Sequence, residues 1–271
     1  MDTAFFETIE GLEYYALAVA YSLARMIGVM SIMPLFTRMR LTGLVRNGAA
    51  IALSIPVIPA IASMLPQMEP VPTFFLLVIM LKEVLIGLVL GIVLGIPFWA
   101  AEAAGDIVDL QRGASMGVLL DPMMSHQTSP TGTLLAIVML AIFLAAGGLE
   151  LVLTVHYRSY ELWPLDQFAP TFSADAADLL LDVLNRVFAM ALILAFPLIV
   201  GLLLSDVMLG FLARASPHLN IFALSLVVKT AVFSVVLVLY APFLVHYMNT
   251  NLGFMRDAAR YLELIACPSC P

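Results

Sequence analysis

The chain has 271 residues, of which 62% belong to the set Ala, Val, Ile, Leu, Met, Phe, Trp, Tyr and Cys and only 11% are charged. Soluble domains carry roughly 25% charged residues, and a folded chain of this size buries only about 75% of the surface that it exposes when unfolded. Its own core therefore cannot cover so much apolar surface, and lipid must cover part of it. A formal net charge of -7 also argues against nucleic acid, so soluble enzymes, disordered tails and nucleic-acid binders are excluded.

The apolar residues collect in six blocks. These blocks are residues 14–36, 47–65, 73–101, 133–153, 183–204 and 222–245. Each is close to the ~20 residues that carry a helix across a ~30 Å hydrocarbon layer, whereas a barrel strand needs only ~9–11. The sequence therefore predicts an all-α integral membrane protein with about six hydrophobic helices in one domain, residues 1–271. The third block would reach about 43 Å as a straight helix, so it must tilt, bend at Pro97 or leave the bilayer.

The charges near the two ends of the chain bear on its orientation. Four acidic residues and no Lys or Arg precede Arg25, which is the reverse of the basic start of a signal peptide, so we expect the first helix to be retained. The arginines after the first block place that loop in the cytoplasm, but Arg256 and Arg260 argue for the opposite orientation if there are six spans. The orientation is left open.

Glycine and proline predict how the helices pack. Gly87, Gly91 and Gly95 recur every four residues, so they share one helix face and predict a seam where a neighbouring helix, of this chain or of another subunit, approaches closely. The alternative is that glycine is simply commoner in membrane helices. Prolines within or at the ends of the apolar blocks predict kinked or broken helices that other polypeptide must cover. They are Pro34, Pro56, Pro59, Pro97, Pro197 and Pro242.

Four charged residues lie deep inside the apolar blocks: Arg25, Lys82, Glu83 and Lys229. A charge at the bilayer midplane costs about 2.5 to 3.5 kcal/mol on translocon scales, so each needs a partner or water. Neighbouring helical side chains point about 100° apart, so we expect Lys82 and Glu83 not to neutralise each other. Because three cations face one acid, we expect partners among carboxylates of other chains, backbone carbonyls or water in a lumen. Snorkelling is the alternative for Lys82.

The connection between the third and fourth blocks, residues 102–132, is rich in polar and turn-forming residues. We expect a helix that ends near residues 113–117 and that carries Asp109 and Arg112 as a favourable i,i+3 pair. Ser129 precedes a proline, as an N-cap does before proline at the first helical position. Two other pairs of this kind predict helix starts. They are Asp121-Pro122 and Ser216-Pro217.

Two patterns resemble enzyme motifs but lack their context. Residues 113–117 match G-x-S-x-G, yet a nucleophile elbow lies between a strand and a helix, and no strand is expected here. Asp106 and Asp206 would form an intramembrane aspartyl pair only if they came close enough to share a proton, whereas both lie at block ends. We therefore expect no enzyme, and the aspartyl pair stands as the weakest alternative.

The candidate metal ligands are too few and too scattered for a site. Cys267 and Cys270 are spaced like half of a zinc knuckle, but zinc takes four ligands and no second pair is present in the sequence. The four histidines lack i,i+4 ligand spacing and are expected at the membrane interfaces. They are His126, His156, His218 and His246. We expect no metal and no cofactor.

Three stretches together carry a resemblance to a known family. GDIVDLQRGASMGVLLDPMMSHQTSPTG, residues 105–132, is similar to the signature region of the T subunit of the type III secretion export apparatus, the family that includes SctT and FliR. Residues 24–53 resemble the first hairpin of that family, and residues 214–229 resemble the start of its last hydrophobic hairpin. The spellings QRGAS and QTSPTG lie nearer to the virulence-associated injectisome branch than to the flagellar one.

The resemblance implies a non-enzymatic subunit of the export gate, with several passes through the bacterial inner membrane. Its partners would be the R, S and U subunits and unfolded secreted proteins in transit, with no role for nucleic acid. The family's pore-closing loop, here called the plug segment, maps onto residues 115–131. The residues expected to form it are Ser115, Met116, Asp121, Pro122, Met123, Met124, Ser125 and His126. Flexible methionine side chains suit a seal against varied polypeptides.

A secondary transporter is the main alternative reading of the residues themselves. The four buried charges, Arg25, Lys82, Glu83 and Lys229, would then bind a small solute or couple to protons at the membrane midplane. Transporter folds are often built from internal repeats, and no convincing repeat relates the two halves of this sequence.

Overall fold

The computed structural model describes most of the chain. The described residues are 3–38, 43–65, 73–113, 129–167, 169–170, 173, 176–216, 218, 220–256 and 258–266. Within these ranges the regular elements are helices and no strand is present, which confirms the all-α prediction. Five helices are long and apolar enough to cross a membrane, and a sixth span results if α7 and α8 are counted together as one broken span. The prediction of a multi-pass protein with about six hydrophobic helices is thus confirmed.

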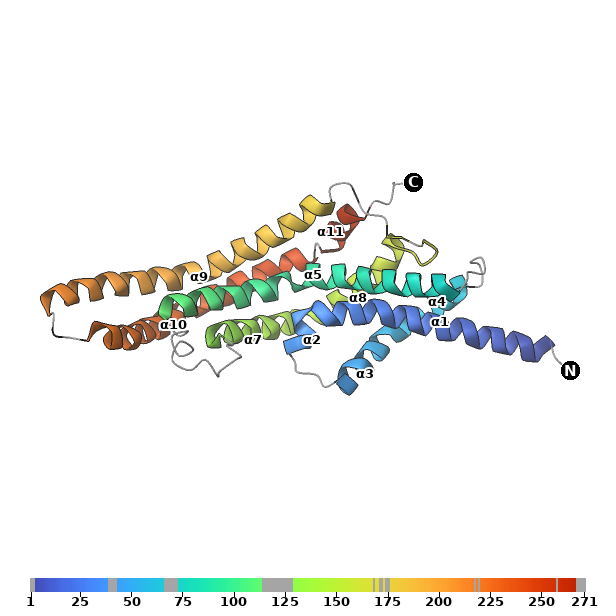
Figure 1. The fold of residues 1–271 in the computed structure, drawn as a ribbon, viewed down its shortest axis with the longest axis horizontal. Helices are drawn as coiled ribbons and strands as arrows, with labels where there is room; N and C mark the ends of the chain where they lie inside the picture. Colours follow the sequence, from blue (N-terminus) through green and yellow to red (C-terminus); the bar gives the residue numbers. More distant parts are fainter. Residues whose placement is uncertain are drawn as a thin grey trace. The chain divides into compact units, whose positions relative to one another are not determined.

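Figure 1 shows the helices coloured along the chain. In order they are α1 (Thr3–Ile32), α2 (Pro34–Arg38), α3 (Gly43–Ser54), the 3₁₀ turn η1 (Ile55–Val57), α4 (Ile58–Met64), α5 (Thr73–Arg112), α7 (Pro130–Ala145), α8 (Gly148–Leu162), α9 (Ala176–Ala215), α10 (Ile221–Arg256) and α11 (Ala258–Ile265). They form two compact units. The first comprises Met1–Gly95, Gly147–Leu181 and Phe254–Pro271, and the second comprises Ile96–Ala146 and Asp182–Gly253.

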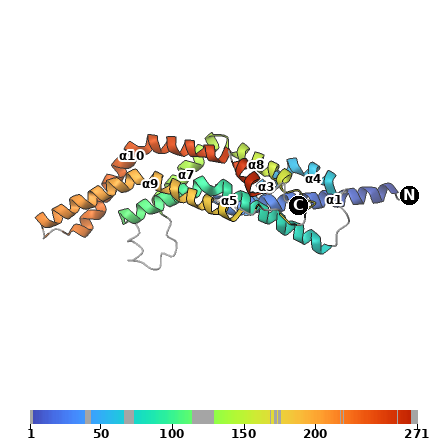
Figure 2. The same cartoon turned by 90° about the horizontal axis from the view of Figure 1, so that it is seen from above.

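Proline breaks some helices and is tolerated in others. Pro34 separates α1 from α2, and Pro56 and Pro59 divide the second apolar block into α3, η1 and α4, as predicted. The three longest helices instead continue through an internal proline, and Figure 2 shows α10 bending within its length. The 40 residues of α5 correspond to about 60 Å at ~1.5 Å per residue, twice the hydrocarbon thickness. Part of α5 therefore extends beyond the hydrocarbon layer, or the helix is strongly tilted.

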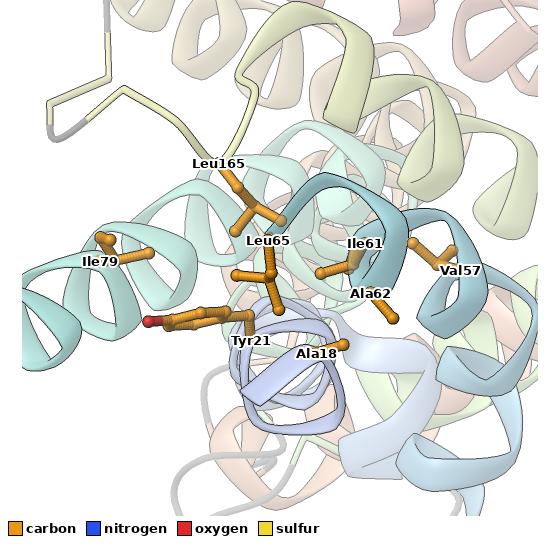
Figure 3. Packing of buried hydrophobic residues seen from close by; sticks show 8 residues of the cluster. All are labelled: Ala18, Tyr21, Val57, Ile61, Ala62, Leu65, Ile79 and Leu165. Atoms are coloured by element: carbon orange, nitrogen blue, oxygen red, sulfur yellow. The ribbon is translucent and has the colours of Figure 1, made fainter. Parts of the chain in front are cut away.

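A small apolar core holds the helices of the first unit together, as Figure 3 shows. Ala18 and Tyr21 of α1 lie against the α4 region, against Ile79 of α5 and against Leu165, which follows α8. The contributions from η1, α4 and its C-cap are Val57, Ile61, Ala62 and Leu65. Tyr157 on α8 adds a hydrogen bond of 3.1 Å to the carbonyl oxygen of Leu53. Together these contacts fix α1, α4, α5 and α8 around one point.

Close helix contacts also organise the second unit. Phe98 on α5 meets Phe143 on α7 edge to face, with ring centroids 5.2 Å apart. Gly201 lets α9 approach α10, because a Cβ there would lie 3.0 Å from Cγ2 of Val236. The start of α10 differs from the prediction. Asn220 Oδ1 accepts a hydrogen bond of 3.2 Å from the Ala223 amide, so the helix begins at Ile221 and the predicted start at residue 217 is wrong.

Candidate functional site

Arg25 lies at the centre of a buried charge cluster in the first unit, here called the Arg25 cluster. Its side chain is fully buried, and Nε donates a hydrogen bond of 2.6 Å to Glu83 Oε2 of α5. The guanidinium also donates to Ser159 Oγ at 2.8 Å and to the Trp163 carbonyl oxygen at 2.9 Å. Its carbon lies 3.7 Å from the ring centroid of Tyr160, a cation–π distance. One arginine thus joins α1, α5 and the end of α8.

Lys82 extends this cluster along α5. Its ammonium donates hydrogen bonds of 2.9 Å to the carbonyl oxygens of Pro164 and Gln167, in the turn after α8. It also lies 3.2 Å from Glu83 Oε1, although that oxygen makes no well-directed hydrogen bond in the described part of the chain. The expectation that Lys82 and Glu83 cannot pair is therefore wrong. Although neighbouring Cβ atoms on a helix point in different directions, the long side chains of Lys and Glu can bend toward each other when both charges are buried.

His156 completes the surroundings of Arg25. It is 1% exposed, and its ring packs edge to face on Tyr157 and Tyr160, with centroids 5.7 and 5.6 Å apart. The prediction that the histidines lie at membrane interfaces concerns depth in the bilayer and stays a prediction, while His156 itself is buried inside the first unit. The sequence did not predict that His156, Ser159 and Tyr160 lie around Arg25. These residues share one face of α8, but that helix carries many polar residues, so its sequence does not indicate that this face is buried.

Two glycines of the predicted seam, Gly87 and Gly91, lie where α5 approaches α1. A Cβ on Gly87 would collide with the Arg25 carbonyl oxygen and lie 2.9 Å from the Cα of Gly28, while a Cβ on Gly91 would lie 3.0 Å from the Val29 carbonyl oxygen. Gly95 is buried on the same helix. Gly28 was missed, since a single glycine in an apolar block gives no periodicity. The close approach of the two backbones brings Arg25 within reach of Glu83.

A second polar cluster, here called the Asp109 cluster, lies at the carboxyl end of α5 in the second unit. Asp109 is 2% exposed. Its Oδ2 accepts hydrogen bonds from Ser129 Oγ at 2.6 Å and from the Thr131 amide at 2.9 Å. Its Oδ1 accepts from Thr131 Oγ1 at 2.6 Å and from Arg112 at 2.7 Å. Ser129 in turn caps α7 by accepting from the Gly132 amide at 2.8 Å, as its position before proline predicts.

Lys229 of α10 is paired within the same unit. Its ammonium lies 2.7 Å from Asp206 Oδ1 of α9 and donates a hydrogen bond of 3.2 Å to the Gln111 carbonyl oxygen. Gln111 also donates to Asp206 Oδ2 at 3.3 Å. Asp206 therefore pairs with Lys229, whereas Asp106 on α5 is exposed. The two aspartates do not form a pair that shares a proton, as an intramembrane aspartyl protease would require. All four charges that were predicted to lie deep in the apolar blocks have ion-pair partners within this chain, so carboxylates of other chains are not required.

The remaining candidates lie largely outside the described residues. This holds for residues 115–128 of the plug segment, including Ser115, Met116, Asp121, Pro122, Met123, Met124, Ser125 and His126, and for Cys267 and Cys270. The last part of the predicted plug segment, residues 129–131, belongs instead to the cap and first turn of α7. Among the residues that are described, no group of three or more His, Cys, Asp or Glu side chains could hold a metal ion.

Comparison with known proteins covers nearly the whole chain. Residues 16–255 match the family model "Bacterial export proteins, family 1". The chain is 38% identical over 236 residues to the Yop proteins translocation protein T of Yersinia pestis, covering 87% of this chain and 90% of that protein. It is 32% identical over 230 residues to the surface presentation of antigens protein SpaR of Salmonella typhimurium, with 84% of each chain covered.

A flagellar relative matches as well. The chain is 29% identical over 251 residues to the flagellar biosynthetic protein FliR of Escherichia coli, covering 90% of this chain and 94% of the relative. The identity is higher with the translocation protein T and SpaR than with this flagellar protein, which fits the injectisome branch. The chain therefore belongs to the bacterial export proteins of family 1, the family of the type III secretion T subunits and FliR.

Proposed function

We propose that this chain is a structural, non-enzymatic subunit of a type III secretion export gate in the bacterial inner membrane. In this proposal its helices form part of the wall of a pore for unfolded proteins, and it assembles with the R and S subunits and contacts the U subunit. The observation that carries the proposal is the similarity to translocation protein T, which extends over 87% of this chain and 90% of the relative. Correspondence over most of both chains supports an equivalent subunit rather than one shared module.

The distribution of exposed apolar side chains supports assembly with other membrane proteins. Of the most apolar stretch of α10, only 6% is buried inside this chain, whereas 50% of the corresponding stretch of α1 is buried. On α10 the exposed fractions reach 73% for Val238, 72% for Leu239 and 69% for Phe243. Helix α9 exposes Phe196 and Phe211 to 64% and 63%. Lipid or sister subunits must cover these faces.

The buried charges support a structural role rather than solute binding. A transporter site needs polar groups that are free to meet a solute at the midplane. Arg25 and Lys82 instead direct their hydrogen bonds to Glu83, Ser159 and backbone carbonyls of this chain. Family membership favours export in the same way, so the transporter alternative has no observation of its own. In this proposal apolar faces, not unsatisfied charges, drive assembly.

The state of assembly tests the proposal. The full chain would be expressed with and without the R and S subunits of its own bacterium, extracted in a mild detergent and weighed by native mass spectrometry. We expect a hetero-oligomer in the first case and a poorly stable or aggregated chain in the second. Leu239→Asn on the exposed face of α10 should reduce co-purification, and Thr250→Asn, also exposed on α10, is the control. A well-behaved monomer that ignores both subunits would refute the proposal.

In the same proposal residues 115–128 close the pore at rest. A deletion tests this, and the structure indicates how long its linker must be. Ser129 Oγ lies 2.6 Å from Asp109 Oδ2, so the end of α5 and the start of α7 are close enough for a short linker to join them. About five Gly and Ser residues, which extend to ~17 Å, would replace residues 115–128. Vesicles that carry the assembled complex should then leak ions faster than vesicles with the wild-type complex. Unchanged conductance would argue against the plug segment.

A further inference from the structure

Buried polar atoms without a hydrogen-bond partner gather around Arg25. Among the described residues, such side-chain atoms belong to Tyr21, Glu83, His156 and Tyr160. They are both tyrosine hydroxyls, Oε1 of Glu83 and both ring nitrogens of His156. Each buried polar group costs free energy unless a hydrogen bond satisfies it. Native proteins rarely leave several of them together, so this concentration requires a physical explanation.

These groups come from three helices and surround one guanidinium. The Tyr160 ring lies 3.7 Å from the Arg25 guanidinium carbon and 5.6 Å from the ring of His156, one turn earlier on α8. Tyr21 lies one turn before Arg25 on α1, and Figure 3 shows its hydroxyl directed toward α5, the helix that carries Glu83. The charge of Glu83 acts on both tyrosine hydroxyls, and that of Arg25 acts on His156. The unpartnered atoms therefore belong to one site in the first unit.

The chemistry of these atoms indicates what kind of molecule could satisfy them. Arg25 donates to one oxygen of Glu83, to a serine hydroxyl and to a backbone carbonyl, and Lys82 donates to two more carbonyls. The second oxygen of Glu83 can only accept, whereas a tyrosine hydroxyl both donates and accepts, and an imidazole with one ring proton has one donor and one acceptor. A molecule that satisfies this set must itself both donate and accept. Water does so.

The charges of the site argue against an ion. Arg25 and Lys82 would repel a cation, because together they outnumber the single acid Glu83. The carbonyl oxygens of Trp163 and Pro164, at the end of α8, already offset part of this positive charge. An anion has no proton to donate and would leave Glu83 Oε1 without a donor. A neutral molecule that both donates and accepts fits the site better than an ion of either sign.

We propose that the Arg25 cluster is a hydrated site, in which one or more internal water molecules link Glu83 Oε1 to the hydroxyls of Tyr21 and Tyr160. Buried waters in proteins typically make about three hydrogen bonds to polar groups that would otherwise be unsatisfied. Water in this position supplies the donor that Glu83 Oε1 lacks within the described part of the chain. The inference does not rest on the proposed function, because it concerns only how the first unit is held together.

Removing single hydroxyls distinguishes a hydrated site from a dry one by the sign of the effect. If water binds the hydroxyl of Tyr160, Tyr160→Phe removes a hydrogen bond, and the ratio of folded to unfolded chain should fall about two- to tenfold. The same fall is expected for Tyr21→Phe. In a dry site each substitution would instead remove a buried hydroxyl that has no partner, so the ratio would rise. A rise or no change in either variant would overturn the inference.

Two further Tyr→Phe variants calibrate the measurement, which is a titration of the full chain in mixed micelles with a denaturing detergent. Tyr157→Phe removes the hydrogen bond of 3.1 Å to the Leu53 carbonyl oxygen, so it shows the loss that one existing hydrogen bond produces. Tyr15 lies on α1 like Tyr21 but is 55% exposed, so Tyr15→Phe should leave the ratio nearly unchanged. These two variants bracket the effect expected at the hydrated site.

A density map separates water from a direct contact between the side chains. In a map of the protein, in whichever assembly it purifies and at a resolution that shows ordered water, a peak should lie about 2.6 to 3.2 Å from Glu83 Oε1. A tyrosine hydroxyl that donates directly to this oxygen, with no such peak, would overturn the inference. Replacing chloride by gluconate at constant ionic strength should leave the stability of the wild-type chain unchanged. A severalfold change in the folded ratio would show that an anion occupies the site and that the inference is wrong.

Discussion

Removing Arg25 should unfold the first unit more readily than removing any exposed charge. Arg25→Met keeps an unbranched apolar stem but deletes three hydrogen-bond donations and the cation–π contact with Tyr160. Among the described residues, it leaves the fully buried Glu83 with the 3.2 Å contact to Lys82 as its remaining ion pair. Breaking a buried pair by removing one partner costs about 3 to 5 kcal/mol. We expect a loss of that size in the free energy of unfolding.

A double-mutant cycle with Glu83→Gln tests the physical cause of this loss. Glu83→Gln alone leaves Arg25 and Lys82 close together without a counterion, so it should also destabilise strongly. The double variant removes both charges of the pair, so it should lose less stability than the sum of the single variants, with a coupling of about 1 to 3 kcal/mol.

Titration of the full chain with a denaturing detergent in mixed micelles would measure these free energies. Arg158→Met is the control, because Arg158 is exposed on α8 and surface substitutions change stability by only about 0.5 kcal/mol. Additive single effects, or an Arg25→Met loss no larger than that of Arg158→Met, would refute the reasoning.

Two further predictions concern the glycine seam and the Lys229 pair. Gly87→Ala should destabilise by about 1 to 3 kcal/mol and Gly91→Ala by less, whereas Gly48→Ala, where no atom lies within 4 Å of the added Cβ, should stabilise by about 0.5 to 1 kcal/mol. The same titration measures all three, and equal effects would contradict the seam. The side chains of the Lys229–Asp206 pair are 15% and 38% exposed, so neutralising either residue alone should lower the free energy of unfolding by about 0.2 to 1 kcal/mol. Exchanging the two residues should restore most of that loss. If every variant of the pair prevented assembly of the complex, the pair would have a role other than stabilising this chain.

Several features of the fold followed from local sequence alone. The apolar blocks have the length that hydrocarbon thickness requires, so they predict the membrane helices without any knowledge of contacts. The same holds for the N-cap at Ser129, for the end of α5 at Gly113 and for the break at Pro34. Each depends on backbone chemistry within a few residues.

The partners of the buried charges could not be read in the same way. Arg25 and Glu83 are 58 residues apart, and Arg25 and Ser159 are 134 apart. The sequence predicts that such charges need partners. It suggested Asp206 only as half of a catalytic aspartyl pair and did not indicate that Asp206 pairs with Lys229. A single glycine such as Gly28 likewise does not indicate, from sequence alone, that the backbone of another helix packs against it.

The sequence by itself determined that the chain is a helical membrane protein of the export family, because composition, block length and motif spelling are properties of the chain in isolation. The tertiary structure alone decided that the charges within the apolar blocks are paired inside this chain and that Asp109 ties α5 to α7. The physical reason is distance along the chain. Desolvation sets the need for a partner locally, whereas the packing of glycine faces between helices selects which distant side chain meets it.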